Sequence, residues 1–314
     1  LSRPTHSYKA FENMSKVKSN MMSLDILGHD DYNNLNNYFI LLEETIQIDP
    51  DYSEAYAYLA MFTLWGALQN SFNDDSAEES DSLYYLAKSY SDTALELDER
   101  NEIALSVNIM MPIIAEFITC DNFEDFTPSV IEIRELIKKT KTMLSYYPDS
   151  PLTNLLHGGA YFFKSFVPII GEEDDEQFAE EYFLKSFNRS KKILDSSPND
   201  GISYYIFYLT TVLLSKNYIE NNELLDAAEI AQEYVDFAEN HNLLSSAYPW
   251  PLAMDIGSVF QKSYQFDNNI KIKKIALNNS FKLNSPDDKI AALYHHVAHG
   301  YLLLGEYDSA KRSE

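Results

Sequence analysis

The feature that most constrains the fold of this chain is a helix-ending joint that recurs at a nearly constant interval. The joint is found at Pro50, Glu99, Pro148 and Pro198, at spacings of 49, 49 and 50 residues. Each joint precedes a segment with apolar residues at helical spacing, over residues 55–68, 102–118, 152–166 and 202–214. A fixed period in this range is typical of a solenoid. The sequence therefore predicts an all-α fold, a right-handed α-solenoid of antiparallel helix pairs with lengthened central repeats.

The same period predicts how the chain divides into repeats and where helices begin. We expect one repeat domain with units at residues 1–50, 51–99, 100–148, 149–198, 199–243, 244–286 and a truncated 287–314. Because the chain starts at Leu1 and stops inside an expected helix, we expect a fragment of a longer protein. Three dipeptides place a capping side chain before a proline at the first helical position, namely Thr127-Pro128, Ser150-Pro151 and Ser285-Pro286.

Composition excludes several classes of protein. The 24 basic and 49 acidic residues give a net charge of −25, which repels phosphate backbones, so we expect no nucleic-acid binding through this segment. Cys120 is the single cysteine, so neither an internal disulfide nor a thiolate metal cluster can form. The longest apolar run, residues 103–120, is interrupted by Asn108, Pro112 and Glu116. That run predicts a buried helix and no membrane insertion.

Apolar, small and aromatic residues recur at set positions near the end of the chain. Counting Ala291 as the first position, they fall at positions 4, 7, 8, 11, 15, 17 and 20: Tyr294, Val297, Ala298, Tyr301, Gly305, Tyr307 and Ala310. This pattern resembles a tetratricopeptide repeat (TPR). Gly158 and Tyr161 repeat the pair at positions 8 and 11, and Ala87 and Ala94 take the small positions of a second helix. Small residues are needed where paired helices cross closely. The central units are about 15 residues longer than the standard 34-residue repeat.

A second resemblance concerns the order of segments near the start. Pro4, residues 7–11, a polar gap and then residues 48–57 resemble the helical tail of bacterial regulators in which a winged-helix or nucleotide-cyclase domain comes first. This resemblance implies a protein-interaction or signal-sensing scaffold in signalling or transcription regulation. The compartment stays open: periplasmic if the chain is like the membrane-spanning CadC-type activators, cytoplasmic otherwise.

Chemistry-bearing residues are few, and the sequence does not predict an enzyme. His295 and His299 lie one helical turn apart, the spacing of a two-histidine metal site, but no Asp or Glu in that helix completes it. We therefore expect ordinary polar groove residues, no metal and no cofactor. His157-Gly158-Gly159 resembles a lipase oxyanion loop, but no G-x-S-x-G motif accompanies it. A metalloenzyme using the histidines remains a third alternative.

Neither of two acidic segments is expected to form a functional site. Residues 121–132 have the length of a calcium-binding loop, but Phe123 and Phe126 occupy the positions of a ligand and of the essential glycine. The run from Glu172 to Glu176 is expected to be a solvated loop tip.

The TPR resemblance implies a concave groove lined by positions 2, 5, 9 and 12 of each first helix. These positions are mostly apolar, and the Lys and Arg residues that clamp a peptide carboxylate in chaperone-binding TPR proteins are missing. The groove would take a protein or peptide partner or a second copy of the chain, or the lengthened helices would cover it. The alternative is a small-molecule pocket lined by the aromatics of residues 204–208 and 161–163. The candidate binding residues are Met61, Leu64, Met110, Leu155, Phe162, Tyr205, Leu209, His295 and His299.

Overall fold

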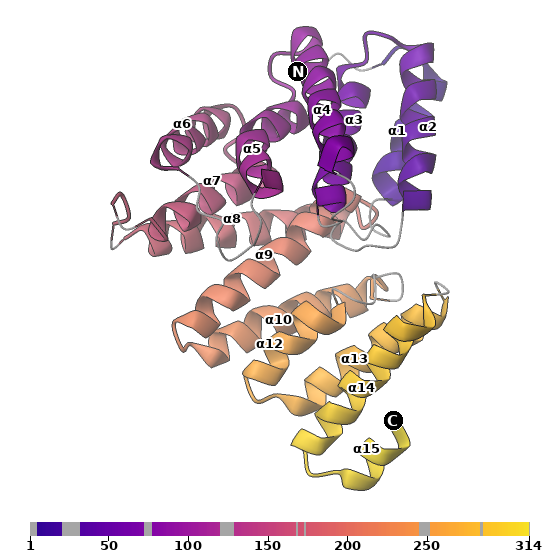
Figure 1. Ribbon diagram of the computed structural model, residues 1–314, viewed down its shortest axis with the longest axis vertical. Helices are drawn as coiled ribbons and strands as arrows, with labels where there is room; N and C mark the ends of the chain where they lie inside the picture. The colour runs from indigo at the N-terminus through magenta and orange to yellow at the C-terminus, as the bar shows by residue number, and fades with distance from the viewer. Residues whose placement is uncertain are drawn as a thin grey trace. The chain divides into compact units, whose positions relative to one another are not determined.

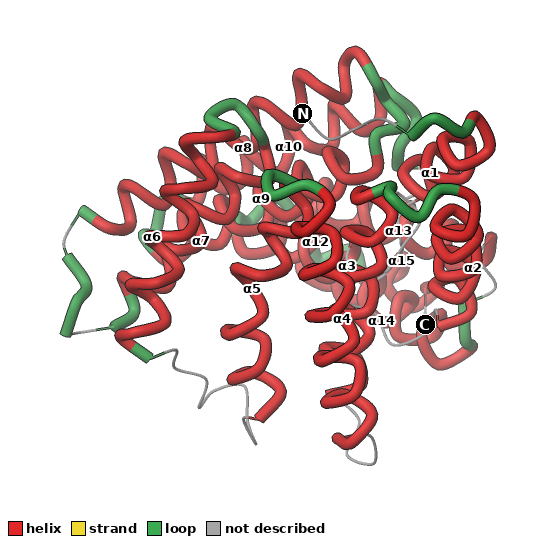
Figure 2. Tube along the Cα trace, turned by 90° about the horizontal axis from the view of Figure 1, so that it is seen from above, coloured by secondary structure: helices red, strands yellow, loops and turns green. Residues whose placement is uncertain are grey.

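A computed structural model describes residues 5–20, 32–71, 77–119, 129–167, 169–172, 174–244, 252–282 and 285–313. Within these ranges every regular element is a helix and no strand occurs (Figures 1 and 2). None of the described helices is both long enough and apolar enough to cross a bilayer. The all-α prediction is confirmed.

The helices belong to two compact units, which are described separately. The first unit contains residues 1–21 and 26–192, and the second contains residues 22–25 and 193–314. In the first unit the helices are α1 (Tyr8–Asn20), α2 (Tyr32–Ile48), α3 (Ser53–Ser71), α4 (Ala77–Leu97), α5 (Glu102–Thr119), α6 (Val130–Tyr146), α7 (Pro151–Ser165) and most of α8 (Asp175–Ser196). In the second they are α9 (Gly201–Glu220), α10 (Leu224–Asn240), the π-helical turn η3 (Leu252–Ile256), α12 (Gly257–Lys262), α13 (Phe266–Lys282), α14 (Asp287–Leu303) and α15 (Tyr307–Ser313).

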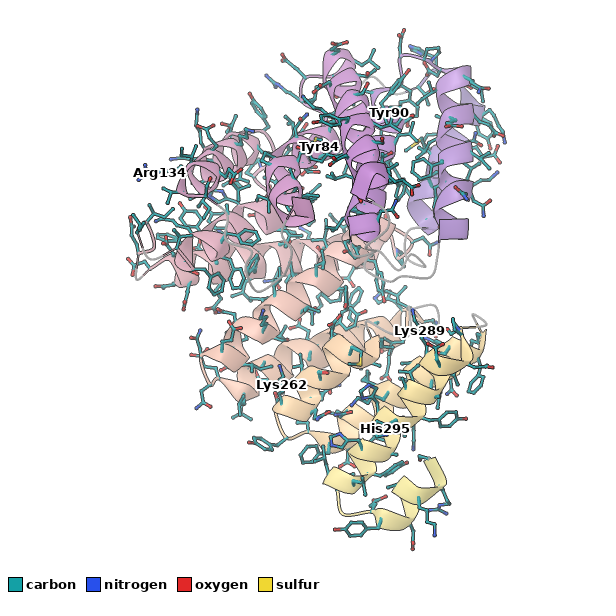
Figure 3. The ribbon with its side chains drawn as sticks, viewed as in Figure 1. Tyr84, Tyr90, Arg134, Lys262, Lys289 and His295 are labelled. Carbon is teal, nitrogen blue, oxygen red and sulfur yellow. The ribbon has the colours of Figure 1, made fainter. Side chains whose placement is uncertain are left out.

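Consecutive helices pack on one another through small residues, as the repeat pattern predicts. Ala60 of α3 and Ala87 of α4 are fully buried in one cluster, with Leu64, Val107 and Met111 filling the adjoining space. Tyr84 and Tyr90 extend from α4 and pack against this cluster (Figure 3). The alanines let two helix backbones approach, and the larger side chains fill the gaps that remain. The fold is therefore a TPR-like succession of helical pairs.

The recurring joints of the first unit are hydrogen-bonded to one another. The Ser53 hydroxyl at the start of α3 donates to the carbonyl of Ala94 (2.8 Å), and the Asn101 amide donates to the Ser53 hydroxyl (2.9 Å). At the next joint the Thr153 hydroxyl donates to the Glu102 carboxylate (2.7 Å). Residues about one period apart thus meet at neighbouring joints, which gives the interval a physical cause.

The predicted helix starts have mixed outcomes. Ser150 caps α7 by accepting a hydrogen bond from the Thr153 amide, and Pro151 is the first helical residue, as predicted. At α14 the prediction is wrong by one position, because Pro286 itself is the capping residue and Asp287 is the first helical residue. Thr127-Pro128 lies outside the described residues, as does most of the 121–132 segment. The capping residue of α6 is Ser129, which forms a reciprocal capping box with Glu132.

Candidate functional site

The predicted groove residues of the first unit lie on first helices of successive pairs and are mostly half-buried. Leu64 is buried, while Met61 and Met110 are partly exposed and pack against the same core cluster. Leu155 and Phe162, both on α7, are also partly exposed. These side chains are thus anchored at their base by the core while retaining apolar surface.

Tyr204 and Phe207 of α9 are buried in the second unit, and Tyr208 is partly buried beside them. The hydroxyls of Tyr204 and Tyr234 are hydrogen-bonded at 2.9 Å, and burial raises the pKa of Tyr204 to about 12. The Tyr208 hydroxyl donates to the carboxylate of Asp255 in η3, whose pKa is raised by burial. Tyr205 and Leu209 are partly exposed on the same helix. The tyrosines therefore hold the π-helical turn in place.

His157 has a structural role in the segment that resembles an oxyanion loop. Its Nδ1 lies 2.9 Å from the Thr140 hydroxyl, which itself donates to the Leu136 carbonyl at 2.9 Å. The side chains of Thr140 and His157 are thus hydrogen-bonded to each other inside the first unit. The ring packs edge-on against Tyr161 and Tyr182. This histidine ties α6 to α7 and α8.

Burial, with smaller contributions from Lys141 and Lys185, lowers the pKa of His157 to about 4. An unfolded histidine titrates near 6.5. Between these values the unfolded chain binds the proton and the folded chain does not, so stability present above pH 6.5 is lost as the pH falls to 4.

We expect His157→Gln to remove up to about 3 kcal/mol of this pH dependence. Chemical denaturation of wild type and variant at pH 7 and pH 4 measures the difference, in which the titration of the many carboxylates cancels. Parallel pH profiles for the two proteins would contradict the assignment.

The acidic run after α7 is not wholly solvated, which corrects the sequence interpretation. Asp175, the first residue of α8, is 1% exposed. Its carboxylate accepts hydrogen bonds from Lys164 Nζ at 2.8 Å and from the Glu172 amide at 2.6 Å. The ion pair closes the connection between α7 and α8.

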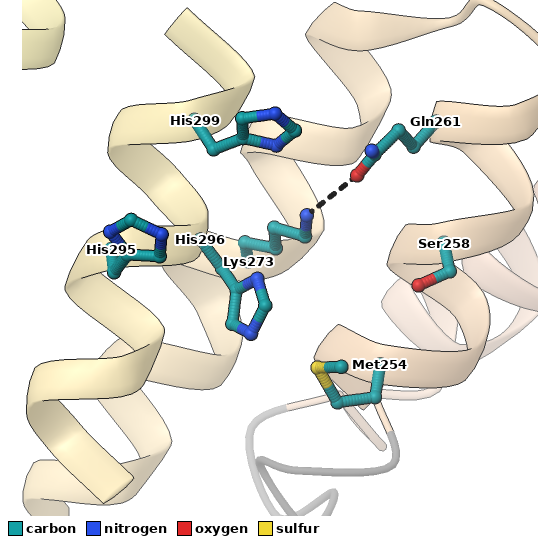
Figure 4. A pocket seen from close by; sticks show the side chains of 7 residues that line it. All are labelled: Met254, Ser258, Gln261, Lys273, His295, His296 and His299. Atoms are coloured by element: carbon teal, nitrogen blue, oxygen red, sulfur yellow. Dashed lines mark hydrogen bonds between the residues drawn. The ribbon is translucent and has the colours of Figure 1, made fainter. Parts of the chain in front are cut away.

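A pocket of about 370 Å³ lies within the second unit, between η3 and α12 on one side and α13 and α14 on the other (Figure 4). Met254, Ser258 and Gln261 line it from η3 and α12. Lys273 enters it from α13, and α14 contributes His295, His296 and His299. This volume is within the range of small-molecule sites.

Lys273 is the buried charge of this pocket. It is 1% exposed, and burial lowers its pKa to about 8, so it remains mostly protonated at pH 7. Its Nζ donates to Gln261 Oε1 at 3.1 Å, and the same oxygen accepts from Asn269 Nδ2 at 3.2 Å. The two donors fix the orientation of the Gln261 amide.

Three histidines line this pocket. His295 and His299 are candidates predicted from the sequence, and His296 is an additional lining residue. His295 is exposed, whereas His296 and His299 are partly buried. Burial and the neighbouring Lys273 lower the pKa of His296. Across the described part of the chain, no group of three or more His, Cys, Asp or Glu side chains is arranged to hold a metal ion.

Sequence reasoning missed Lys273, although the sequence carries a signal for it. Ile270, Lys273 and Leu277 fall at helical spacing, which places a lysine on the buried stripe of α13. Met254, Ser258 and Gln261 carry no comparable signal, because their convergence depends on how η3 and α12 pack against α13.

No protein-family model matches the chain, and no curated protein is similar to it in sequence. Among solved structures, it is similar to a chain of the APC/C hetero-tetramer Cut9-Hcn1, with 15% identity and a TM-score of 0.29. The match covers 96% of this chain and spans 58% of the length of that one. A likeness at this level establishes no common function.

Proposed function

We propose that the chain is a non-catalytic protein-interaction or signal-sensing domain of a larger bacterial regulator. The observation that carries the proposal is the set of apolar side chains on first helices that the fold anchors but does not cover. Met61, Met110 and Phe162 are examples, each partly exposed on α3, α5 or α7. Apolar surface presented on a rigid helical scaffold is typical of sites that bind a partner helix or peptide.

The partner expected at this surface is a protein rather than nucleic acid, because the net charge of −25 opposes polyanions. The proposed repeat units supply the scaffold, and self-association is the alternative occupant of the surface.

Site-specific photo-crosslinking in cells tests this proposal. We expect a benzophenone amino acid at Met110 or Phe162 to give a discrete crosslinked protein of defined mass. The same probe at Lys138, whose side chain is 74% exposed on α6, serves as the matched control and is expected to give none. A product from all three positions, or from none, would argue against the proposal; a product of twice the chain mass would identify a second copy as the partner.

A small-molecule-binding module is the second candidate function, and it is favoured by the pocket of the second unit. That pocket is lined by histidines and a lysine instead of the aromatic residues that the sequence suggested. It is independent of the crosslinking surface, since its lining residues all come from η3, α12, α13 and α14.

A further inference from the structure

The pocket of the second unit has a charge composition opposite to that of the whole chain. Acidic residues outnumber basic ones by 49 to 24 in the sequence, yet the pocket lining contains one lysine, three histidines and no carboxylate. The acid nearest along the chain, Asp255, follows Met254 directly, but its carboxylate is held by the Tyr208 hydroxyl. The pocket therefore brings basic side chains together without an acidic side chain in its lining.

The ammonium of Lys273 lacks a counter-charge among the residues that the structure describes. None of their carboxylates forms an ion pair with it, and the amide oxygen of Gln261 is the acceptor found for its Nζ. Buried lysines are rarely found without an opposite charge, because removing the ammonium from water is costly unless it is paired. A neutral amide oxygen can accept one of the three ammonium protons and leaves the charge uncompensated.

Other donors surround the same space. Figure 4 shows the Lys273 ammonium between Gln261 and the imidazoles of His296 and His299, with Ser258 on the facing helix. Hydroxyl, imidazole and ammonium groups can all donate hydrogen bonds to an oxyanion. Met254 adds an apolar contact at the edge of the pocket.

The backbone at this wall is also irregular. η3 is a π-helical turn, and Asp255 within it is fixed by Tyr208. Single π-helical turns inside helices occur frequently at functional sites. Here the turn carries Met254 and leads directly into α12, which supplies Ser258 and Gln261.

We propose that this pocket binds a small oxyanion, either inorganic phosphate or the carboxylate of a compact organic acid, with Lys273 as its principal charge partner and Ser258, His296 and His299 as further donors. The proposal rests on the second candidate function, small-molecule binding, and not on the protein-interaction surface of the first unit. The volume of about 370 Å³ admits a molecule of a few carbon atoms.

Titration calorimetry and thermal denaturation of the purified chain at pH 7 and fixed ionic strength test the proposal. The probes are inorganic phosphate, succinate and citrate, with erythritol as a neutral probe and putrescine as a cationic one. We expect at least one oxyanion to bind saturably, in the millimolar range or tighter. Binding of phosphate alone would identify a phosphate site, and binding of succinate or citrate alone a carboxylate site; either supports the proposal.

Lys273→Met separates a binding role from a structural one. The substitution keeps the apolar stem and removes the buried charge, and Gln261 Oε1 retains its bond from Asn269, so we expect the variant to fold with undiminished stability. Its oxyanion affinity should fall at least about tenfold. Lys262→Met is the matched control, because Lys262 is an exposed lysine on the neighbouring helix (Figure 3), and it should bind like wild type.

If Lys273→Met does not fold, His299→Gln tests the proposal instead. His299 is partly exposed, so we expect this variant to fold and to bind the oxyanion severalfold more weakly. Unchanged affinity in the folded variant overturns the proposal. Saturable binding of erythritol or putrescine with no oxyanion binding would overturn it while leaving small-molecule binding intact. Binding of none of the five probes would count against both.

Discussion

Asp175→Ala is expected to lower the free energy of unfolding by about 3 kcal/mol. The carboxylate is almost fully buried and is bonded to Lys164 and to the Glu172 amide. Its removal leaves Lys164, whose side chain is 14% exposed, with Glu172 as its ion-pair partner at 3.4 Å. Because the Glu172 side chain is 75% exposed, that pair is screened by water and compensates little. Urea denaturation measures the loss.

Asp174→Ala is the matched control, since it removes the same charge one residue earlier from an exposed side chain. Because Asp174 directly precedes α8 and its carbonyl accepts from the Phe178 amide, its effect should be about 1 kcal/mol, well below that of Asp175→Ala. Adding Lys164→Met to Asp175→Ala should recover part of the loss, because the double variant no longer buries an unpaired ammonium. Equal effects of the two aspartate substitutions would show that the buried ion pair contributes nothing to stability.

Gly158→Ala is expected to destabilise the first unit by about 2 kcal/mol through overpacking at the crossing of α7 and α8. An added Cβ would lie 2.8 and 2.9 Å from two ring atoms of Phe183 and 3.1 Å from the backbone oxygen of Ala179. Phe183 is 1% exposed, so its ring has no room to withdraw. Thermal and urea denaturation both report the change.

The adjacent glycine provides the control for this prediction. A Cβ on Gly159 would have no neighbour within 4 Å, so Gly159→Ala should stabilise the helix by about 0.5 to 1 kcal/mol. The two substitutions are chemically identical and are expected to have opposite signs. If both stabilise the protein, close helix crossing at Gly158 is not what requires glycine there.

The sequence predicts those parts of the fold that depend on local periodicity. The predicted segments 102–118 and 152–166 agree closely with α5 and α7, because apolar spacing and capping residues are properties of adjacent residues. The repeat pattern assigns Gly158 and Ala87 to small positions, and both lie where helices meet. The prediction of helix starts is less accurate, as the capping position of Pro286 shows.

Features that depend on contacts between residues far apart in the sequence cannot be predicted from local periodicity. Asp175 is in an acidic run, which predicts solvent exposure. It is buried because it forms an ion pair with Lys164, and no sequence pattern indicates that pair. The pocket requires η3, α12, α13 and α14 to meet, and η3 is a local irregularity without a distinct pattern. The one-turn spacing in the sequence nonetheless singles out His295 and His299, which line this pocket.

Hydrogen–deuterium exchange of the domain with the protein that crosslinks to Met110 or Phe162 tests the interaction proposal most directly. We expect slower exchange in peptides of the first helices α3, α5 and α7 when the partner is bound, with α6 unchanged. Protection confined to α6, or no protection in the first unit at all, would contradict the interaction proposal.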